Sequence, residues 1–114
     1  MTERDLKHIQ NMLEAAHAAL VFSDKRTQEQ LFGDTRLVFA LVKALDLLGD
    51  AASRVSSDGR EAAAQINWDQ ISTLPQRIYH DNDDINLSVV WDAVTNEIPQ
   101  LSAQLQHLKF MYSS

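Results

Sequence analysis

Apolar residues recur along the chain at alternating steps of three and four, which is the pattern of amphipathic helices. One stripe lies between about residues 3 and 22, and a wider one lies between about residues 35 and 56. Thr2 and Asp34 stand directly before these segments and are typical N-cap residues. Residues 56–59, Ser-Ser-Asp-Gly, form a turn signal that we expect to end the second helix.

Two further helical segments follow, and each contains a proline. A third helix is expected to begin near Asn67 and carries Pro75, whereas a fourth follows Asn86 and carries Pro99. Proline has no N–H and its ring clashes with the preceding turn, so each helix should break or kink at its proline. The connections are short, which favours antiparallel neighbours. The sequence therefore predicts an all-α, up-down four-helix bundle that forms a single domain over residues 1–114.

Composition narrows the possible functions. The chain has 114 residues and no cysteine, which excludes disulfides, thiolate metal sites and a cysteine nucleophile. The N-terminus is polar and the apolar runs are short, so we expect a cytoplasmic protein that does not cross a membrane. The net charge of −6 argues against broad binding to a phosphate backbone, although a small site could still contact one or two phosphates.

Histidine provides the first candidate chemistry. His8, His17 and His107 lie beside apolar stripes and read as surface residues, whereas His80 ends a helical segment and meets the acidic stretch 81–84. A helix C-terminus and nearby carboxylates both favour imidazolium, which would suit His80 to proton transfer near neutral pH. The alternative is a histidine that only caps the helix. No glycine-rich phosphate loop, HExxH pair or EF-hand pattern is present, so we expect no metal and no cofactor.

Four sequence segments together carry a family resemblance. They read LVKALDLLGDAASRV at 41–55, INWDQI at 66–71, INLSVVWDAV at 85–94 and EIPQL at 97–101. This pattern resembles the HepT-like branch of the HEPN superfamily and covers nearly the whole chain. The resemblance implies a small all-α homodimer and the toxin half of a toxin–antitoxin module. It also implies metal-independent endoribonuclease activity on RNA, and a minimal nucleotidyltransferase antitoxin that can silence the toxin by transferring AMP to it.

The family's catalytic motif is an arginine, a polar residue, a short spacer and a histidine, with a tyrosine two residues later. His80 matches the family histidine. Pro75 stands at the arginine position, Gln76 at the polar position and Asn82 at the tyrosine position. Asp50 replaces the glutamate that the family carries in its second helix. The resemblance therefore assigns His80 to catalysis and leaves the cationic role without its usual residue.

Arg77 could supply that missing cation. Metal-free RNA cleavage needs a base, an acid and a cation that stabilises charge on the phosphate oxygens. Residues three apart lie on one face of a helix, so Arg77 would stand about one turn from His80. We hypothesise that Arg77 binds the phosphate, with the two histidines of a dimer in one cleft. The competing interpretation is that Arg77 pairs on the surface with Asp81 or Asp84. Supporting roles are expected for Gln76, Asp81, Asn82 and Asp50.

The residue that accepts AMP and two alternative functions stay open. The family tyrosine is absent, so Tyr79, next to His80, is the first candidate to accept AMP, and Tyr112 lies in the tail. The incomplete motif also fits a catalytically inactive HEPN protein that binds a nucleotidyltransferase partner or a nucleotide. Amphipathic helices alone would fit a helical oligomerisation module.

Overall fold

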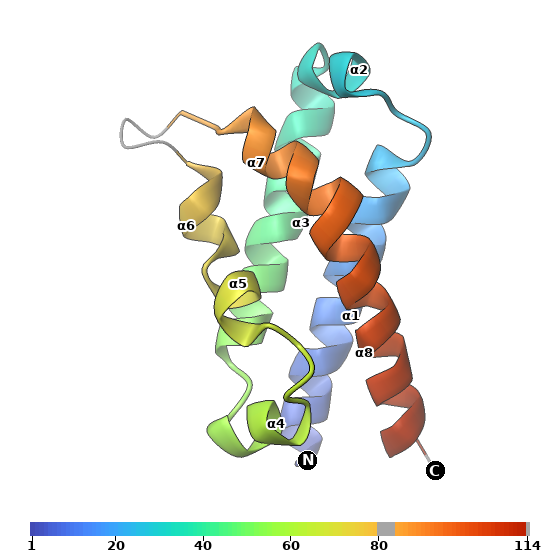
Figure 1. Ribbon diagram of the computed structural model, residues 1–114, viewed down its shortest axis with the longest axis vertical. Helices are drawn as coiled ribbons and strands as arrows, with labels where there is room; N and C mark the ends of the chain where they lie inside the picture. The colour runs from blue at the N-terminus through green and yellow to red at the C-terminus, as the bar shows by residue number, and fades with distance from the viewer. Residues whose placement is uncertain (80–83, 114) are drawn as a thin grey trace.

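A computed structural model describes residues 1–79 and 84–113. Two long helices, α1 (Glu3–Ser23) and α3 (Thr35–Ser53), run antiparallel through the centre, and the short helix α2 (Gln28–Phe32) connects them (Figure 1). The predicted caps are confirmed, because the Thr2 and Asp34 side chains accept hydrogen bonds from backbone N–H groups in the first turns of α1 and α3. The described residues contain helices and no strand, which confirms the all-α prediction.

The second long helix ends earlier than the sequence indicated. Residues 56–59 do not simply end it but begin α4 (Ser57–Ala62), with Ser56 as N-cap. The cause is a contact across the fold: the buried Asp5 carboxylate accepts hydrogen bonds from the Ser56 N–H (2.9 Å) and hydroxyl (2.6 Å). Asp5 thereby ties the start of α1 to the start of α4, at the end of the molecule where both termini lie (Figure 1). These hydrogen bonds lower the pKa of Asp5, because they stabilise its ionised form.

The third helix breaks at its proline, as predicted. It consists of α5 (Trp68–Ser72) and α6 (Leu74–Ile78), and Pro75 occupies the first turn of α6, where its missing N–H costs no hydrogen bond. Asn67 caps α5 through its side chain. Because of this break, α6 is a separate short helix that packs against α3.

The fourth segment is one long helix with an irregular middle. It comprises α7 (Leu87–Asp92), a π-helical turn η1 (Ala93–Glu97) and α8 (Ile98–Tyr112). Within it the Ile98 N–H donates to the Ala93 carbonyl, five residues earlier. Pro99 follows at the start of α8 and cannot donate to the preceding turn, which confirms the predicted disturbance at this proline.

The core lies where α1, α3 and α8 face one another, and α5 and α6 cover the outer side of α3. Its largest fully buried side chains include Met12, Leu41, Leu45, Leu105 and Leu108. Across the described residues, no helix is both long and apolar enough to cross a membrane.

Candidate functional site

The helix α6 carries the sequence-predicted site and is held tightly against α3. Gly49 lies beneath Pro75, and a Cβ atom added to Gly49 would lie only 2.4 Å from the Pro75 Cδ. Leu74 and Ile78 anchor α6 further, because both side chains are fully buried. This close approach of Pro75 to α3 requires glycine at position 49. It holds α6, and with it the backbone of Arg77, at a fixed position relative to α3.

Arg77 is paired with a residue of the fourth helical segment. Its guanidinium forms an ion pair with Glu97 (Nη2 to Oε1, 3.0 Å) and donates to the Gln70 carbonyl (2.7 Å). The Glu97 side chain is only 7% exposed, whereas that of Arg77 is 35% exposed. The sequence did not indicate Glu97 as a partner. Two of the five guanidinium N–H donors have no partner among the described residues and are available to an anion.

The other predicted site residues are placed as follows. His80, Asp81 and Asn82 lie outside the described residues. Gln76 is exposed on α6, next to Arg77 in the chain. Asp50 does not join Arg77: it forms an exposed ion pair with Arg54 (3.0 Å) on α3 and lines a groove between α1 and α3.

Tyr79 is 39% exposed, and its hydroxyl hydrogen-bonds to the Asp46 carboxylate. Burial raises the pKa of Asp46, while Lys43 and the Tyr79 hydrogen bond oppose that rise. One carboxylate oxygen of Asp46 is buried and has no partner within the described part of the chain. Asp46 is not among the residues predicted from the sequence, although a carboxylate between Leu45 and Leu47 in an apolar helix was an available signal.

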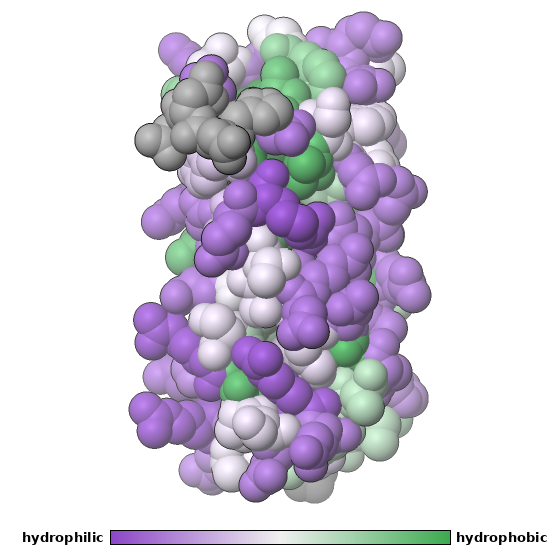
Figure 2. Space-filling view, turned by 60° about the vertical axis from the view of Figure 1, so that its left-hand side comes forward, coloured by the Kyte–Doolittle hydropathy of each residue, from purple (hydrophilic) through white to green (hydrophobic). Residues whose placement is uncertain are grey.

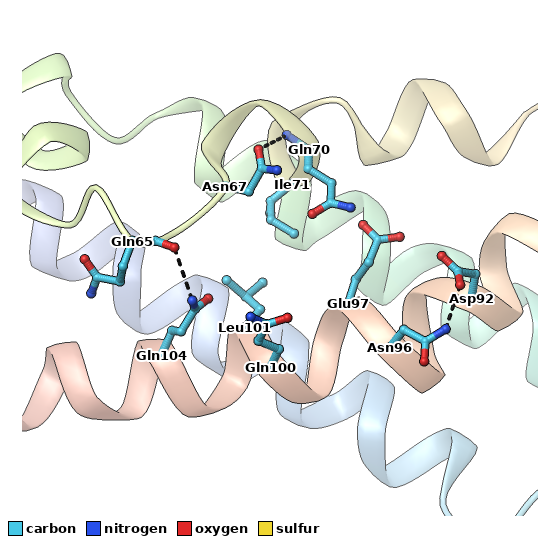
Figure 3. A pocket seen from close by; sticks show the side chains of 10 residues that line it. All are labelled: Gln65, Asn67, Gln70, Ile71, Asp92, Asn96, Glu97, Gln100, Leu101 and Gln104. Carbon is cyan, nitrogen blue, oxygen red and sulfur yellow. Dashed lines mark hydrogen bonds between the residues drawn. The ribbon is translucent and has the colours of Figure 1, made fainter.

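A polar cavity of about 370 Å³ lies beside Arg77, between α5 and the η1–α8 segment (Figure 3). Because side-chain amides dominate its lining, we call it the amide pocket. Within its lining, the Gln104 side chain donates to the Gln65 carbonyl (3.2 Å), and Asn96 donates to Asp92 (2.7 Å). The six amides come from Gln65, Asn67, Gln70, Asn96, Gln100 and Gln104.

The amide pocket is not among the sites predicted from the sequence either. Its available signal was the four-residue spacing of Asn96, Gln100 and Gln104, which places three amides on one helix face. The π-helical turn includes Asn96 and Glu97 and ends three residues before Gln100. The face of the molecule on which α5 and α6 lie is largely hydrophilic (Figure 2).

Comparison with known proteins identifies the family of this chain. The model of the family described as "Ribonuclease HepT-like" matches residues 12–108, which is most of the chain. The chain belongs to the ribonuclease HepT-like family. The resemblance inferred from the sequence segments is therefore confirmed.

Individual relatives are distant but cover most of their length. The chain is 22% identical to "Probable ribonuclease HepT" of Thermococcus cleftensis over 102 residues, covering 90% of this chain and 93% of that one. It is 25% identical to "Putative RNase TTE0752" of Caldanaerobacter subterraneus over 80 residues, covering 70% and 71% of the two chains. No solved structure matches the chain significantly. These relatives support a ribonuclease-type function for this HepT-like protein.

Within the described residues, no group of three His, Asp or Glu side chains is arranged to hold a metal ion. Arg77 contacts the amide pocket's lining through Gln70 and Glu97. The amide pocket itself offers hydrogen bonding from side-chain amides, and the neighbouring Arg77 offers one guanidinium to an anion.

Proposed function

We propose that this HepT-like protein is an endoribonuclease in which His80 transfers protons and Arg77 binds the scissile phosphate. The 2′-hydroxyl would lose its proton to a histidine and attack the adjacent phosphorus, and the bond to the 5′-oxygen would break as that oxygen gains a proton. Arg77 would stabilise the charge that develops on the nonbridging oxygens. The single observation that carries this proposal is Arg77 itself, a half-buried guanidinium three residues before His80, two of whose N–H donors have no partner among the described residues.

Glu97 has a positioning role in this proposal. A buried carboxylate that contacts both terminal nitrogens holds the guanidinium plane in one orientation. The remaining donors then point to a defined place, which lowers the cost of fixing Arg77 when phosphate binds.

The direct test is cleavage of a mixed-sequence RNA by purified wild type, His80→Ala and Arg77→Ala in EDTA. Arg36→Ala is the matched control, because Arg36 is an exposed arginine on α3 outside the site. We expect a loss of at least about 100-fold for the two site variants and no change for the control. Loss with His80→Ala but not with Arg77→Ala would refute the role of Arg77 and leave a histidine mechanism standing.

A second candidate is a catalytically inactive protein that binds a nucleotidyltransferase or a nucleotide. The observation that favours it is Pro75, which occupies the family's arginine position and packs so closely on Gly49 that no Cβ fits at position 49 without a shift. In addition, Glu97 already neutralises Arg77. Absence of RNA cleavage by wild type, with tight binding of a nucleotidyltransferase, would favour this candidate.

The toxin–antitoxin role is part of the first proposal. A minimal nucleotidyltransferase would silence the protein by moving AMP from ATP to the Tyr79 oxygen, releasing pyrophosphate and the phenolic proton. The Asp46 carboxylate, hydrogen-bonded to that hydroxyl, is placed to accept the proton. Intact-mass measurement should show the mass of one added AMP on wild type and on Tyr112→Phe, and none on Tyr79→Phe. AMP on Tyr79→Phe would refute this acceptor.

A homodimer is the expected assembly. Support comes from the groove between α1 and α3, which has a volume of about 640 Å³ and is lined by Phe22, Leu47 and several alanines. Leu47 is 50% exposed and Phe22 39% exposed, so two large apolar side chains of this groove face water together. Light scattering at micromolar concentration should give a dimer mass, and Leu47→Glu should give a monomer. Phe110→Glu, at an exposed site on α8 outside the groove, is the control; a monomeric wild type would refute the proposal.

A further inference from the structure

The amide pocket adjoins the proposed phosphate-binding arginine. Arg77 donates to the Gln70 carbonyl and pairs with Glu97, and both residues line the pocket. A phosphate bound by the free donors of Arg77 would therefore have its neighbouring nucleoside within reach of the pocket. Arg77 lines neither the amide pocket nor the apolar groove between α1 and α3, but the hydrogen bonds of its guanidinium within the described residues all go to the lining of the amide pocket.

The lining combines a polar rim with an apolar floor. The side-chain amides of Gln70 and Gln100 have no hydrogen-bond partner among the described residues, so each offers a donor and an acceptor. Ile71 of α5 and Leu101 of α8, both nearly fully buried, point toward each other from opposite sides of the pocket (Figure 3). A flat ring with a polar edge matches this arrangement, because its face can contact the aliphatic side chains while its edge is hydrogen-bonded.

Charge decides between a base and a phosphate as the occupant. Asp92 and Glu97 line the pocket, and none of the described lining residues is cationic. An anion would be repelled there, whereas a neutral ring with N–H donors would be accepted. Amide side chains are also the groups that read base edges through paired donor and acceptor contacts.

We infer that the amide pocket binds a nucleobase of single-stranded RNA, next to the phosphate held by Arg77. The inference rests on the proposed ribonuclease function for its RNA substrate, but it concerns a separate property: which base lies beside the cleaved bond. Gln70 and Gln100 are the specificity-determining side chains, and the π-helical turn places Asn96 and Glu97 at the same opening.

The test follows the side-chain amides directly, without any need for catalysis. The ¹⁵N-labelled protein is titrated with each of the four ribonucleoside 5′-monophosphates and with ribose 5-phosphate, which has sugar and phosphate but no base. We expect at least one nucleotide to shift the NH₂ resonances of Gln70 and Gln100, and ribose 5-phosphate to leave them unchanged. Shifts of equal size with ribose 5-phosphate, or none with any nucleotide at millimolar concentration, would overturn the inference.

A matched pair of variants completes the design. Gln100→Ala removes one free amide from the pocket, whereas Gln106→Ala removes an exposed amide from the same helix outside it. Losing one hydrogen bond should weaken nucleotide binding about 3- to 10-fold for Gln100→Ala and leave it unchanged for Gln106→Ala. Equal affinities for the two variants would count against the pocket.

The outcomes distinguish this inference from the proposed function. Pocket shifts without RNA cleavage would refute the ribonuclease proposal and support a nucleotide site. RNA cleavage whose base preference is identical in wild type and Gln100→Ala, with no pocket shifts, would overturn the nucleobase site and leave the ribonuclease proposal intact.

Discussion

Gly49→Ala tests whether the packing of α6 against α3 sets the geometry of the site. The new Cβ would lie 2.4 and 2.5 Å from the Pro75 Cδ and Cγ, whereas carbon atoms in contact normally lie about 3.5–4.0 Å apart. Because Leu74 and Ile78 are fully buried, α6 can relieve the overlap only by moving about 1 Å away from α3. Arg77 lies on α6 and would move with it.

Two opposing terms set the expected change in stability. Overpacking costs about 1–3 kcal/mol, while replacing a mid-helix glycine by alanine gains about 1 kcal/mol. The net loss should be about 0–2 kcal/mol, which lowers the melting temperature of a domain of this size by up to about 8 °C. RNA cleavage should fall much more, by about 100-fold, because a displacement of about 1 Å in a catalytic site has that effect.

Thermal denaturation by circular dichroism measures the first quantity, and a cleavage assay measures the second. Gly33→Ala is the control, since Gly33 lies at the end of α2 and an added Cβ there meets only the Glu29 carbonyl at 3.3 Å. Amide resonances of α6 report its movement independently of activity. A Gly49→Ala protein with unchanged α6 resonances and wild-type cleavage would refute the argument.

Three further predictions concern stability. Asp5→Ala should lower the free energy of unfolding by about 2–3 kcal/mol at pH 7, since it removes two hydrogen bonds to a buried carboxylate. Because the folded-state pKa of Asp5 is lowered, this contribution is present above pH of about 4 and is lost as the pH falls further, so wild type and variant should converge in urea titrations at acidic pH. Asp46→Asn should stabilise the protein at pH 7 by up to about 1 kcal/mol, because burial disfavours the charged form, with the advantage disappearing where Asp46 is protonated. Trp68→Phe should cost about 1–3 kcal/mol, since it removes a buried hydrogen bond to the Ala63 carbonyl (3.0 Å), and urea denaturation measures it.

Each of these has a contradicting result. A constant difference between wild type and Asp5→Ala down to pH 2 would show that the carboxylate is not the source of the effect. A loss of stability in Asp46→Asn at pH 7 would mean that the ionised group is favoured in the folded protein. An unchanged unfolding midpoint in Trp68→Phe would mean that water replaces the lost hydrogen bond.

The sequence alone determined the elements that depend on local chemistry. Short polar side chains were expected to cap the helices, and the structure confirms that each accepts a hydrogen bond from a backbone N–H in the first turn. These N-cap residues are Thr2, Asp34, Asn67 and Asn86. The prolines break the third segment and disturb the fourth, because a missing N–H and a rigid ring act within one turn. The family could also be identified from the sequence, since it rests on the spacing of whole segments.

The tertiary structure decided everything that depends on partners distant in the chain. Arg77 had several acidic residues nearby in the sequence, yet the fold brings it Glu97 from a different helix, 20 residues away. Ser56 looked like the end of a helix, but Asp5, 51 residues away, makes it the start of another. The amide pocket exists only where α5 faces the fourth helix. Helical periodicity determines which face of each helix is apolar, whereas packing angles and side-chain lengths determine which polar groups meet, and these are set only when the helices come together.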